Sequence, residues 1–339
     1  MKSIVKISTT AALIAAMALT SCERRALEDD YKEYALVPVQ IDWSLSGVSV
    51  EQMHRASVWL FPHDESAPLQ YRLEGNLTYR EIRVPAGIYS VLVFNETIDK
   101  EDWNGIAFKG TDKYHTFAAT SIPQKEIGFY NSSEELPLIG NPEALAAWSL
   151  DYFEVTEEMI FDTRTNLKNS AALVAKVPEL TAIKPLPRFE RVIVNVYVTN
   201  LASSKQVTAT IDAMYSGVYM VSGKRITKPA AQAFIFNVRD YDGYDGTTTC
   251  TFNIFGKPTK ANHNLNIDFL LTNNEMHPRE EFDVTNLITS STIDYVQTHV
   301  INIGYGNDNG DHEITLPKGD MNADNITVED WDEIRIPLN

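Results

Sequence analysis

Residues 191–198 read Arg-Val-Ile-Val-Asn-Val-Tyr-Val, with a valine at every second position. Neighbouring side chains in a β strand point to opposite faces, so this period of two predicts a strand with one branched, buried face. The same period appears earlier in the chain, at Val37, Val39, Ile41 and Trp43, and again at Ala56, Val58 and Leu60. Each of these stretches is predicted to be a strand with one buried face, which points to an all-β protein.

Turn residues separate these runs into short strands. Pro85-Ala86-Gly87 predicts a hairpin between strands at 82–84 and 88–95. In the second half, Tyr215-Ser216-Gly217 predicts a turn between strands at 207–214 and 218–221, and Ser222-Gly223 predicts the next turn. Further strands are expected at 171–177, 233–238, 248–255, 265–272 and 299–303.

One stretch departs from the strand pattern. Residues 142–160 begin with a proline, continue with Glu143-Ala144-Leu145-Ala146-Ala147 and contain scattered acidic residues. Alanine, leucine and glutamate favour helices, so a minor helical or irregular insertion is predicted in the first half of the chain.

The length of the chain indicates more than one hydrophobic core. At 339 residues, two domains of roughly 150 residues each are expected. Pro178, Pro185 and Pro187 interrupt the strand pattern, and a boundary between residues 183 and 184 follows. Residues 22–35 are charged and without a clean period, which predicts a tether ahead of domains at 36–183 and 184–339.

The N-terminus resembles a secretion signal. Lys2 and Lys6 precede an apolar run at 11–19 that is too short to span a bilayer. The tetrad Leu19-Thr20-Ser21-Cys22 resembles the lipobox of bacterial lipoproteins. That resemblance implies a signal peptide at 1–21, a lipid on Cys22 and an outer-membrane protein. Display at the cell surface is favoured, and the periplasmic leaflet stays open. An uncleaved buried helix fits this order of residues less well.

Charge and cysteine content limit the partners. The net charge is −17, so a phosphate backbone would be repelled and nucleic acid is not expected as a partner. Once Cys22 carries lipid, Cys250 is the one remaining cysteine, which leaves no intramolecular disulfide to form. Cys250 lies in a threonine-rich predicted strand, where a small buried side chain is expected in preference to a nucleophile.

Several sequence segments, taken together, resemble segments of the Bacteroidales fimbrillins and fimbrial anchor proteins. The matching segments are Val84–Asn95, Ala213–Lys224, Phe282–Asn286 and Val328–Ile334, in that order along the chain. The resemblance implies two tandem transthyretin-like antiparallel β-sandwiches of Greek-key topology behind a lipobox. It implies no cofactor and no catalytic residue. The family contains pilus subunits, anchors and related surface lipoproteins.

The position of the first arginines after the lipidated cysteine distinguishes polymerising members of that family from the others. Polymerising members have an arginine a few tens of residues beyond the lipidated cysteine, where a protease removes a strand. Here Arg24 and Arg25 follow Cys22 at once, and Arg55 lies in a predicted strand. This departure favours a lipid-retaining fimbrial anchor or accessory subunit that contacts pilin-like partners by strand exchange. An anchor, a tip protein and a stand-alone adhesin all remain open.

Metal and catalytic motifs are incomplete. Asp320–Asn325 begins like a calcium loop, but Asn325, Thr327 and Trp331 stand where glycine, an apolar residue and a carboxylate are needed. Residues 306–311 favour a hairpin loop. His263, His277 and His299 could converge, although dispersed histidines are the expected outcome. We therefore expect no metal and no enzyme.

Aromatic residues leave a second function open. Trp43, Trp59 and Trp331 fall in predicted strands and are expected in the core, whereas Trp103 and Trp148 fall in irregular regions, where an indole can stack on a sugar ring. The alternative is therefore a glycan-binding surface lipoprotein of a polysaccharide uptake system. A glycosidase would need two carboxylates about 5–9.5 Å apart in one cleft.

Overall fold

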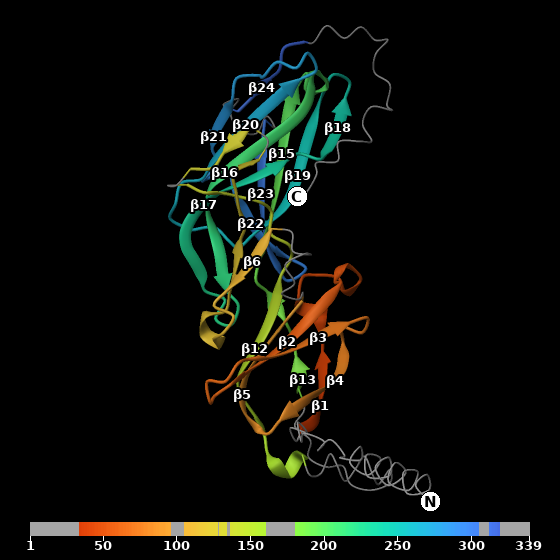
Figure 1. Cartoon of the computed structure of the whole chain (residues 1–339). Helices are drawn as coiled ribbons and strands as arrows, with labels where there is room; N and C mark the ends of the chain where they lie inside the picture. The colour runs from red at the N-terminus through yellow and green to blue at the C-terminus, as the bar shows by residue number, and fades with distance from the viewer. Residues whose placement is uncertain are drawn as a thin grey trace, which may run out of the picture. The chain divides into compact units, whose positions relative to one another are not determined.

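The computed structural model describes residues 34–95, 105–127, 129–133, 136–160, 180–304 and 312–318 (Figure 1). Within these ranges almost all regular structure is β strand. The helical parts are the 3-10 turns η1 (Trp43–Leu45), η2 (Val50–Gln52), η3 (Tyr114–Thr116) and η4 (Leu201–Ser203), together with residues 157–160. The prediction of an all-β sandwich protein is confirmed.

Two sheets are built mainly from the first half of the chain. A five-stranded sheet has the order β14 (Leu186–Pro187), β12 (Ala146–Val155), β5 (Gly87–Phe94), β2 (Arg55–Pro62) and β3 (Leu69–Glu74). A three-stranded sheet has the order β13 (Leu180–Ile183), β1 (Tyr34–Ile41) and β4 (Tyr79–Pro85). In the second sheet β1 and β13 run parallel, with Val39 opposite Leu180.

A six-stranded sheet forms one layer of the second half. Its order is β18 (Val238–Asp242), β19 (Asp245–Ile254), β15 (Glu190–Thr199), β23 (Val296–Ile303) and β22 (Thr289–Ile293), and β24 (Ile314–Thr315) also pairs with β15. The strand with the alternating valines, β15, lies in the middle. It pairs antiparallel with β19 and parallel with β23.

An eight-stranded sheet forms the other layer. Its main path is β21 (Glu280–Asp283), β20 (Asn264–Leu271), β16 (Ser204–Tyr219), β17 (Arg225–Ile235), β11 (Leu138–Ile139) and β8 (Pro123–Gln124). Strands β6 (Ile106–Lys109) and β7 (Ala118–Ser121) join it through the end of β16. Beside these sheets, β9 (Glu126–Ile127) and β10 (Tyr130–Asn131) pair with each other.

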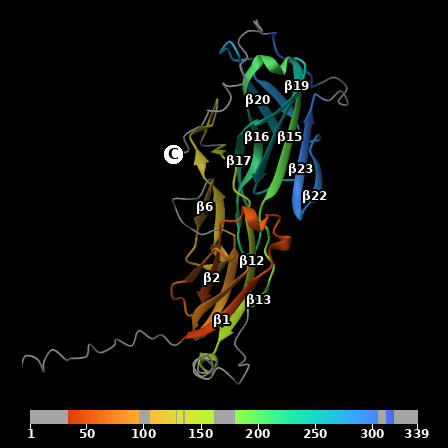
Figure 2. The same cartoon turned by 90° about the vertical axis from the view of Figure 1, so that its right-hand side faces the viewer.

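The two larger sheets form a sandwich (Figure 2). One core cluster takes Val192, Val194, Val196 and Val198 from β15 together with apolar residues of β16, β17, β19, β20 and β23. All four valines are buried, which confirms the predicted one-sided strand. Burying branched apolar side chains between two layers is the main force that stabilises such a sandwich.

The strand β2 differs from its prediction, because both of its faces are buried. Ala56, Val58 and Leu60 are buried as expected, but Trp59 and Phe61 on the opposite face also enter a cluster. That cluster combines β2 and β5 with Phe117 and with apolar residues from the second half of the sequence: Val218, Met220 and Phe255. A strand covered on both sides loses its alternation of apolar and polar residues, which is why its sequence is almost wholly apolar.

The predicted hairpin around Pro85-Ala86-Gly87 is wrong. The residues do turn the chain, but β4 and β5 on either side of them belong to different sheets. The strand β4 lies in the three-stranded sheet, whereas β5 pairs with β2 and lies in the five-stranded sheet. Turn residues determine only that the chain reverses direction locally. Which strand each of the two flanking strands pairs with is decided by tertiary contacts.

The predicted turn at Tyr215-Ser216-Gly217 is also wrong. The strand β16 continues through it for 16 residues, with irregular register between Ile211 and Met214 and between Tyr215 and Gly217. Gly217 instead lets the backbones of β16 and β7 lie close together. A Cβ at this position would lie 2.5 Å from the carbonyl oxygen of Ala119 on β7. The turn at Ser222-Gly223 is confirmed, with Gly223 at φ +67° between β16 and β17.

The predicted helical insertion at 142–160 is mostly wrong. Residues 146–155 form the ten-residue strand β12, and only residues 157–160 are helical. Ala146 pairs with Pro187 of β14, and β5 lies on the other side of the strand. Sheet pairing has therefore overridden the helical preference of alanine and leucine. The predicted strand at 171–177 lies outside the described residues.

Contacts within the chain divide it into two units. Of the described residues, 34–37, 81–87 and 154–160 fall in the smaller unit, and the remainder fall in the larger one. A boundary between two sandwiches at residues 183 and 184 stays a prediction. None of the helices in the described ranges has the length and apolar character to cross a bilayer.

Candidate functional site

Several residues and segments that the sequence analysis singled out lie outside the described ranges. These are Cys22 and Trp103, the calcium-like segment 320–325, the loop 306–311 and the segment 328–334. Their predicted roles therefore stay predictions. Among the described residues, no group of three or more His, Cys, Asp or Glu side chains is placed to hold a metal ion.

Trp148 is not in an irregular region, contrary to the prediction. It lies in β12 and is partly exposed. Tyr152 lies four residues further along the same strand, so both side chains belong to the same face. Tyr152 is 54% exposed, and its ring packs edge-on to His63 at a centroid distance of 6.4 Å. The two aromatic residues make a partly open stripe on β12. By contrast, Trp43 and Trp59 are buried as predicted, although Trp43 lies in η1 and not in a strand.

Cys250 is buried in β19 and has no disulfide partner among the described residues. Burial raises the pKa of its thiol to about 12. A thiol with such a pKa is protonated at neutral pH, and the thiolate is the nucleophilic form. The prediction of a small buried side chain is confirmed.

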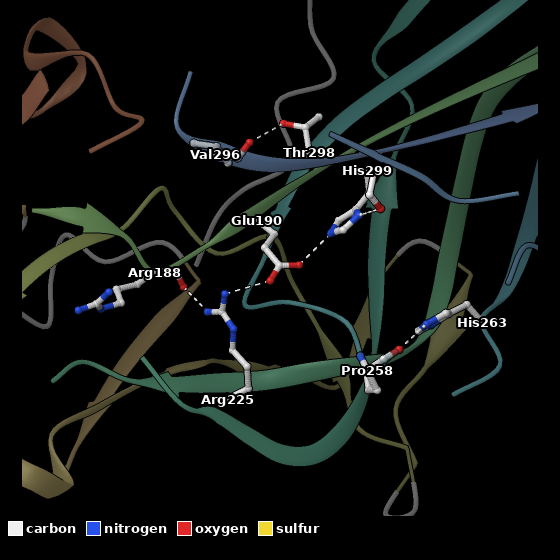
Figure 3. Close-up of polar contacts among 9 residues, drawn as sticks. Arg188, Glu190, Arg225, Pro258, His263, Val296, Thr298 and His299 are labelled. Atoms are coloured by element: carbon white, nitrogen blue, oxygen red, sulfur yellow. Dashed lines mark hydrogen bonds and ion pairs between the residues drawn. The ribbon is translucent and has the colours of Figure 1, made fainter. Parts of the chain in front are cut away.

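The three histidines that could have converged each have separate partners. The ring of His263 contacts the carbonyl oxygens of Asp212 and Pro258, at 3.1 Å each. His277 contacts Glu280 at 3.0 Å, and His299 contacts Glu190 at 2.8 Å. Figure 3 shows His263 and His299 with these different partners. The expectation that the histidines are dispersed is confirmed.

A network of charged side chains centres on Glu190, at the start of β15 (Figure 3). One carboxylate oxygen accepts a hydrogen bond from Arg225 at 3.0 Å, and the other contacts His299 at 2.8 Å. His299 in turn contacts the hydroxyl of Ser290 at 2.7 Å. Both oxygens of Glu190 therefore have partners from other strands, β17 and β23.

The arginines extend the network through the backbone. Arg225 also donates to the carbonyl oxygen of Arg188 at 2.8 Å, and Arg188 donates to the carbonyl oxygen of Met220 at 2.9 Å. Burial and the like charge of Arg225 lower the pKa of Arg188. Gly256 leaves room for the network, since a Cβ there would lie 2.7 Å from a carboxylate oxygen of Glu190.

The network keeps Glu190 ionised. Burial alone would raise the pKa of its carboxyl, but the hydrogen bond from His299 and the charge of Arg225 together lower it below its usual value. A lowered carboxyl pKa beside an arginine is found in structural ion pairs as well as in active sites. It does not by itself indicate catalysis. The arrangement joins β15, β17 and β23, and both carboxylate oxygens of Glu190 already have a partner within it.

The sheet edges differ in how they are protected. Natural edge strands usually carry charges or proline, which discourage pairing with another chain. Most edge strands of the described sheets follow this rule. The residues concerned are Arg72 and Glu74 in β3, Pro123 in β8, Pro187 in β14, Arg239, Asp240 and Asp242 in β18, and Glu280, Glu281 and Asp283 in β21.

The strand β22 is the clearest exception. Its sequence, Thr-Ser-Ser-Thr-Ile, contains no charge, proline or glycine, and all five side chains are exposed. It pairs with β23 along one edge, and no other described strand pairs with it. The edge strand β13 also lacks charge and proline, but it has four residues and its two end residues are buried. We therefore regard β22 as the candidate interaction edge. The sequence reasoning missed this strand altogether.

Two solved structures are similar to this chain. A proposed adhesin from Bacteroides ovatus matches 88% of this chain and 97% of its own length, at 19% identity and a TM-score of 0.55. The fimbrial anchor protein Mfa2 from Porphyromonas gingivalis matches 80% of this chain and 90% of its own, at 13% identity and a TM-score of 0.41. Of these two, only the adhesin passes a TM-score of 0.5, and at its identity it shows a shared fold.

No curated protein matches the sequence. A family model does match, over residues 21–235, which is more than half of the chain. The matched segment runs from the residue before Cys22 to the end of β17. The chain therefore belongs to the family described as a domain of unknown function, DUF5119.

Proposed function

We propose that this chain is a non-enzymatic, lipid-anchored protein of the outer membrane that acts at the cell surface as a fimbrial anchor or accessory subunit. The observation that carries the proposal is the β-sandwich fold, which the chain shares over most of its length with a proposed adhesin. The lipobox-like tetrad ending in Cys22 supports attachment to the membrane through lipid. The segments that resemble fimbrillins and fimbrial anchors support the fimbrial role.

The mechanism that we propose has two parts. Acyl chains on Cys22 hold the base of the protein in the membrane, since more than one chain is needed for stable attachment. An exposed sheet edge then pairs with an extended strand of a pilin-like subunit. Backbone hydrogen bonds would supply affinity and the side chains along the edge would supply specificity, so no cofactor or metal is required.

Deleting the gene and replacing Cys22 test this proposal. Deletion should reduce the number or the retention of surface filaments, and Cys22→Ala should release the protein from the membrane fraction. Pull-down with the wild-type protein from native membranes should recover a pilin-like subunit. Unchanged filament number, length and retention after deletion, together with no pilin-like partner, would overturn the proposal.

The partly open stripe of Trp148 and Tyr152 on β12 favours one further candidate function, glycan binding. Two aromatic rings on one strand face can stack on successive sugar units. A glycan array should then show saturable binding that is lost in Trp148→Ala or Trp103→Ala and kept in Tyr295→Ala, which removes an exposed ring from another hairpin. An array without binding to any glycan would remove this candidate.

A further inference from the structure

We infer that the outer edge of β22 is the acceptor for an extended, non-acidic segment of a partner protein. This inference rests on the proposed strand-exchange function and assigns it to one edge. The strands β22 and β23 form a hairpin. Ile293 faces Val296 across a loop of two residues, Asp294 and Tyr295, whose φ angles are 48° and 66°.

The length of this loop fixes which backbone groups point outward. In a hairpin with a two-residue loop, the residues flanking the loop exchange both backbone hydrogen bonds, and bonded pairs then alternate with non-bonded pairs. Counting back from Ile293, the backbone groups of Ser291 and Thr289 point toward β23. The N–H and C=O groups of Ser290 and Thr292 therefore point to the outer edge.

Side-chain contacts agree with this alternation. Non-bonded pairs bring their side chains closer together than bonded pairs. Ser290 is paired with His299 in the register, and its hydroxyl lies 2.7 Å from the imidazole Nδ1. That hydrogen bond also connects β22, through His299 of β23, to the network of Glu190 and Arg225. The position of β22 is therefore fixed by contacts beyond its backbone pairing.

The chemistry of the edge selects the occupant. The opposite edge of the same sheet, β18, carries Arg239, Asp240 and Asp242, whereas β22 carries no charge. An added strand would pair its backbone with Ser290 and Thr292 and would cover Ile293, which is 42% exposed. The net charge of −17 would repel acidic segments and a second copy of this chain. The partner segment is therefore uncharged or basic, with alternating polar and branched residues.

A peptide that alternates threonine and valine between two lysines serves as the probe, with fluorescence anisotropy on the full mature chain as the measurement. We expect saturable binding that Thr292→Pro weakens about tenfold, since it removes one outward N–H and blocks close approach. Thr292→Lys should weaken binding as well, without altering the backbone. The matched control is Val238→Lys on β18, which should bind like wild type.

Three results would overturn the inference. One is no binding, or equal binding by wild type and both Thr292 variants. Another is slow hydrogen exchange at the amides of Ser290 and Thr292 in the free chain, because the chain would then cover its own edge. The third is a wild-type dimer in sedimentation that Thr292→Lys makes monomeric. If filaments are lost on gene deletion but kept in both Thr292 variants, the proposed function stands and the assignment to β22 fails.

Discussion

Glu190 and Gln232 are both largely buried polar side chains in the second half of the chain, but their surroundings differ. Each carboxylate oxygen of Glu190 has a partner, Arg225 on one side and His299 on the other. Gln232 is 0% exposed, and neither its amide oxygen nor its amide nitrogen has a hydrogen-bond partner in the described structure. The charged group is thus the better satisfied of the two, because each of its two oxygens lies within reach of a donor on another strand.

The two sites differ in how a substitution should affect the stability of the protein. Removing one partner of a buried ion pair leaves an uncompensated charge, which is strongly destabilising. Removing an amide that already lacks partners relieves a desolvation penalty. Substitutions at the two sites are therefore expected to have opposite effects on the free energy of unfolding.

Arg225→Met should have the largest effect. It leaves Glu190 with His299 alone, and we expect a loss of about 3 kcal/mol in the free energy of unfolding, near the lower end for buried pairs because Arg225 is partly exposed. Urea unfolding followed by fluorescence measures this loss. Lys224→Met, at the exposed neighbouring residue, is the control and should change little. Equal losses in the two variants would show that the ion pair is not responsible.

Acidification should weaken the Glu190 network in the wild type. The pKa of Glu190 is lowered in the folded protein from an ordinary value of 4.5, so its stabilising contribution is full above that pH and is lost as the pH falls through the folded value. Glu190→Gln has no such group and should show a smaller acid dependence. Unfolding free energies of both proteins between pH 7 and pH 3 test this. Parallel curves would contradict the assignment.

Gln232→Met should stabilise the protein. The substitution removes two unpaired buried polar atoms and keeps a similar volume, so a gain of about 1–2 kcal/mol is expected. Thermal unfolding of the variant measures the gain, and Gln297→Met at an exposed position serves as its control. A loss of stability at Gln232 would instead indicate that an internal water hydrogen-bonds the amide.

Tyr130→Phe should have the smallest effect. The hydroxyl of Tyr130 donates to the carbonyl oxygen of Asn266 at 2.7 Å, while its ring lies 4.6 Å from the guanidinium of Arg279. The substitution removes the hydrogen bond and keeps the ring contact, so a loss of about 1 kcal/mol is expected. Tyr295→Phe, at a ring that is 61% exposed, should be neutral in the same urea titration. No loss in Tyr130→Phe would show that this bond does not hold β10 to β20.

Local pattern predicted the strands better than it predicted their partners. The valines of β15 were identified because alternation is a property of the strand itself. Pro85-Ala86-Gly87 marked a real reversal, yet it could not reveal that β4 and β5 enter different sheets. The strand β12 was mistaken for a helical segment because its alanines have no strand preference, and its pairing with β14 is a contact between distant residues.

The candidate site was harder to predict than the fold. Glu190 lies 35 residues from Arg225 and 109 from His299, so no spacing motif could connect them. The strand β22 was missed because its loop, Asp294-Tyr295, lacks the glycine that usually announces a two-residue hairpin. The signals that were present are the threonine-rich run at 289–293 and its lack of charge.

The central position of β15 has a consequence for how the chain folds. This strand ends at Thr199, but its parallel partner β23 begins only at Val296. In a chain that emerges from the N-terminus onward, the edge of β15 that pairs with β23 stays open until nearly a hundred further residues have followed. Pairings between such distant segments form slowly, and the waiting intermediate exposes aggregation-prone surface. A binding chaperone that covers this open edge would therefore raise the yield of folded protein.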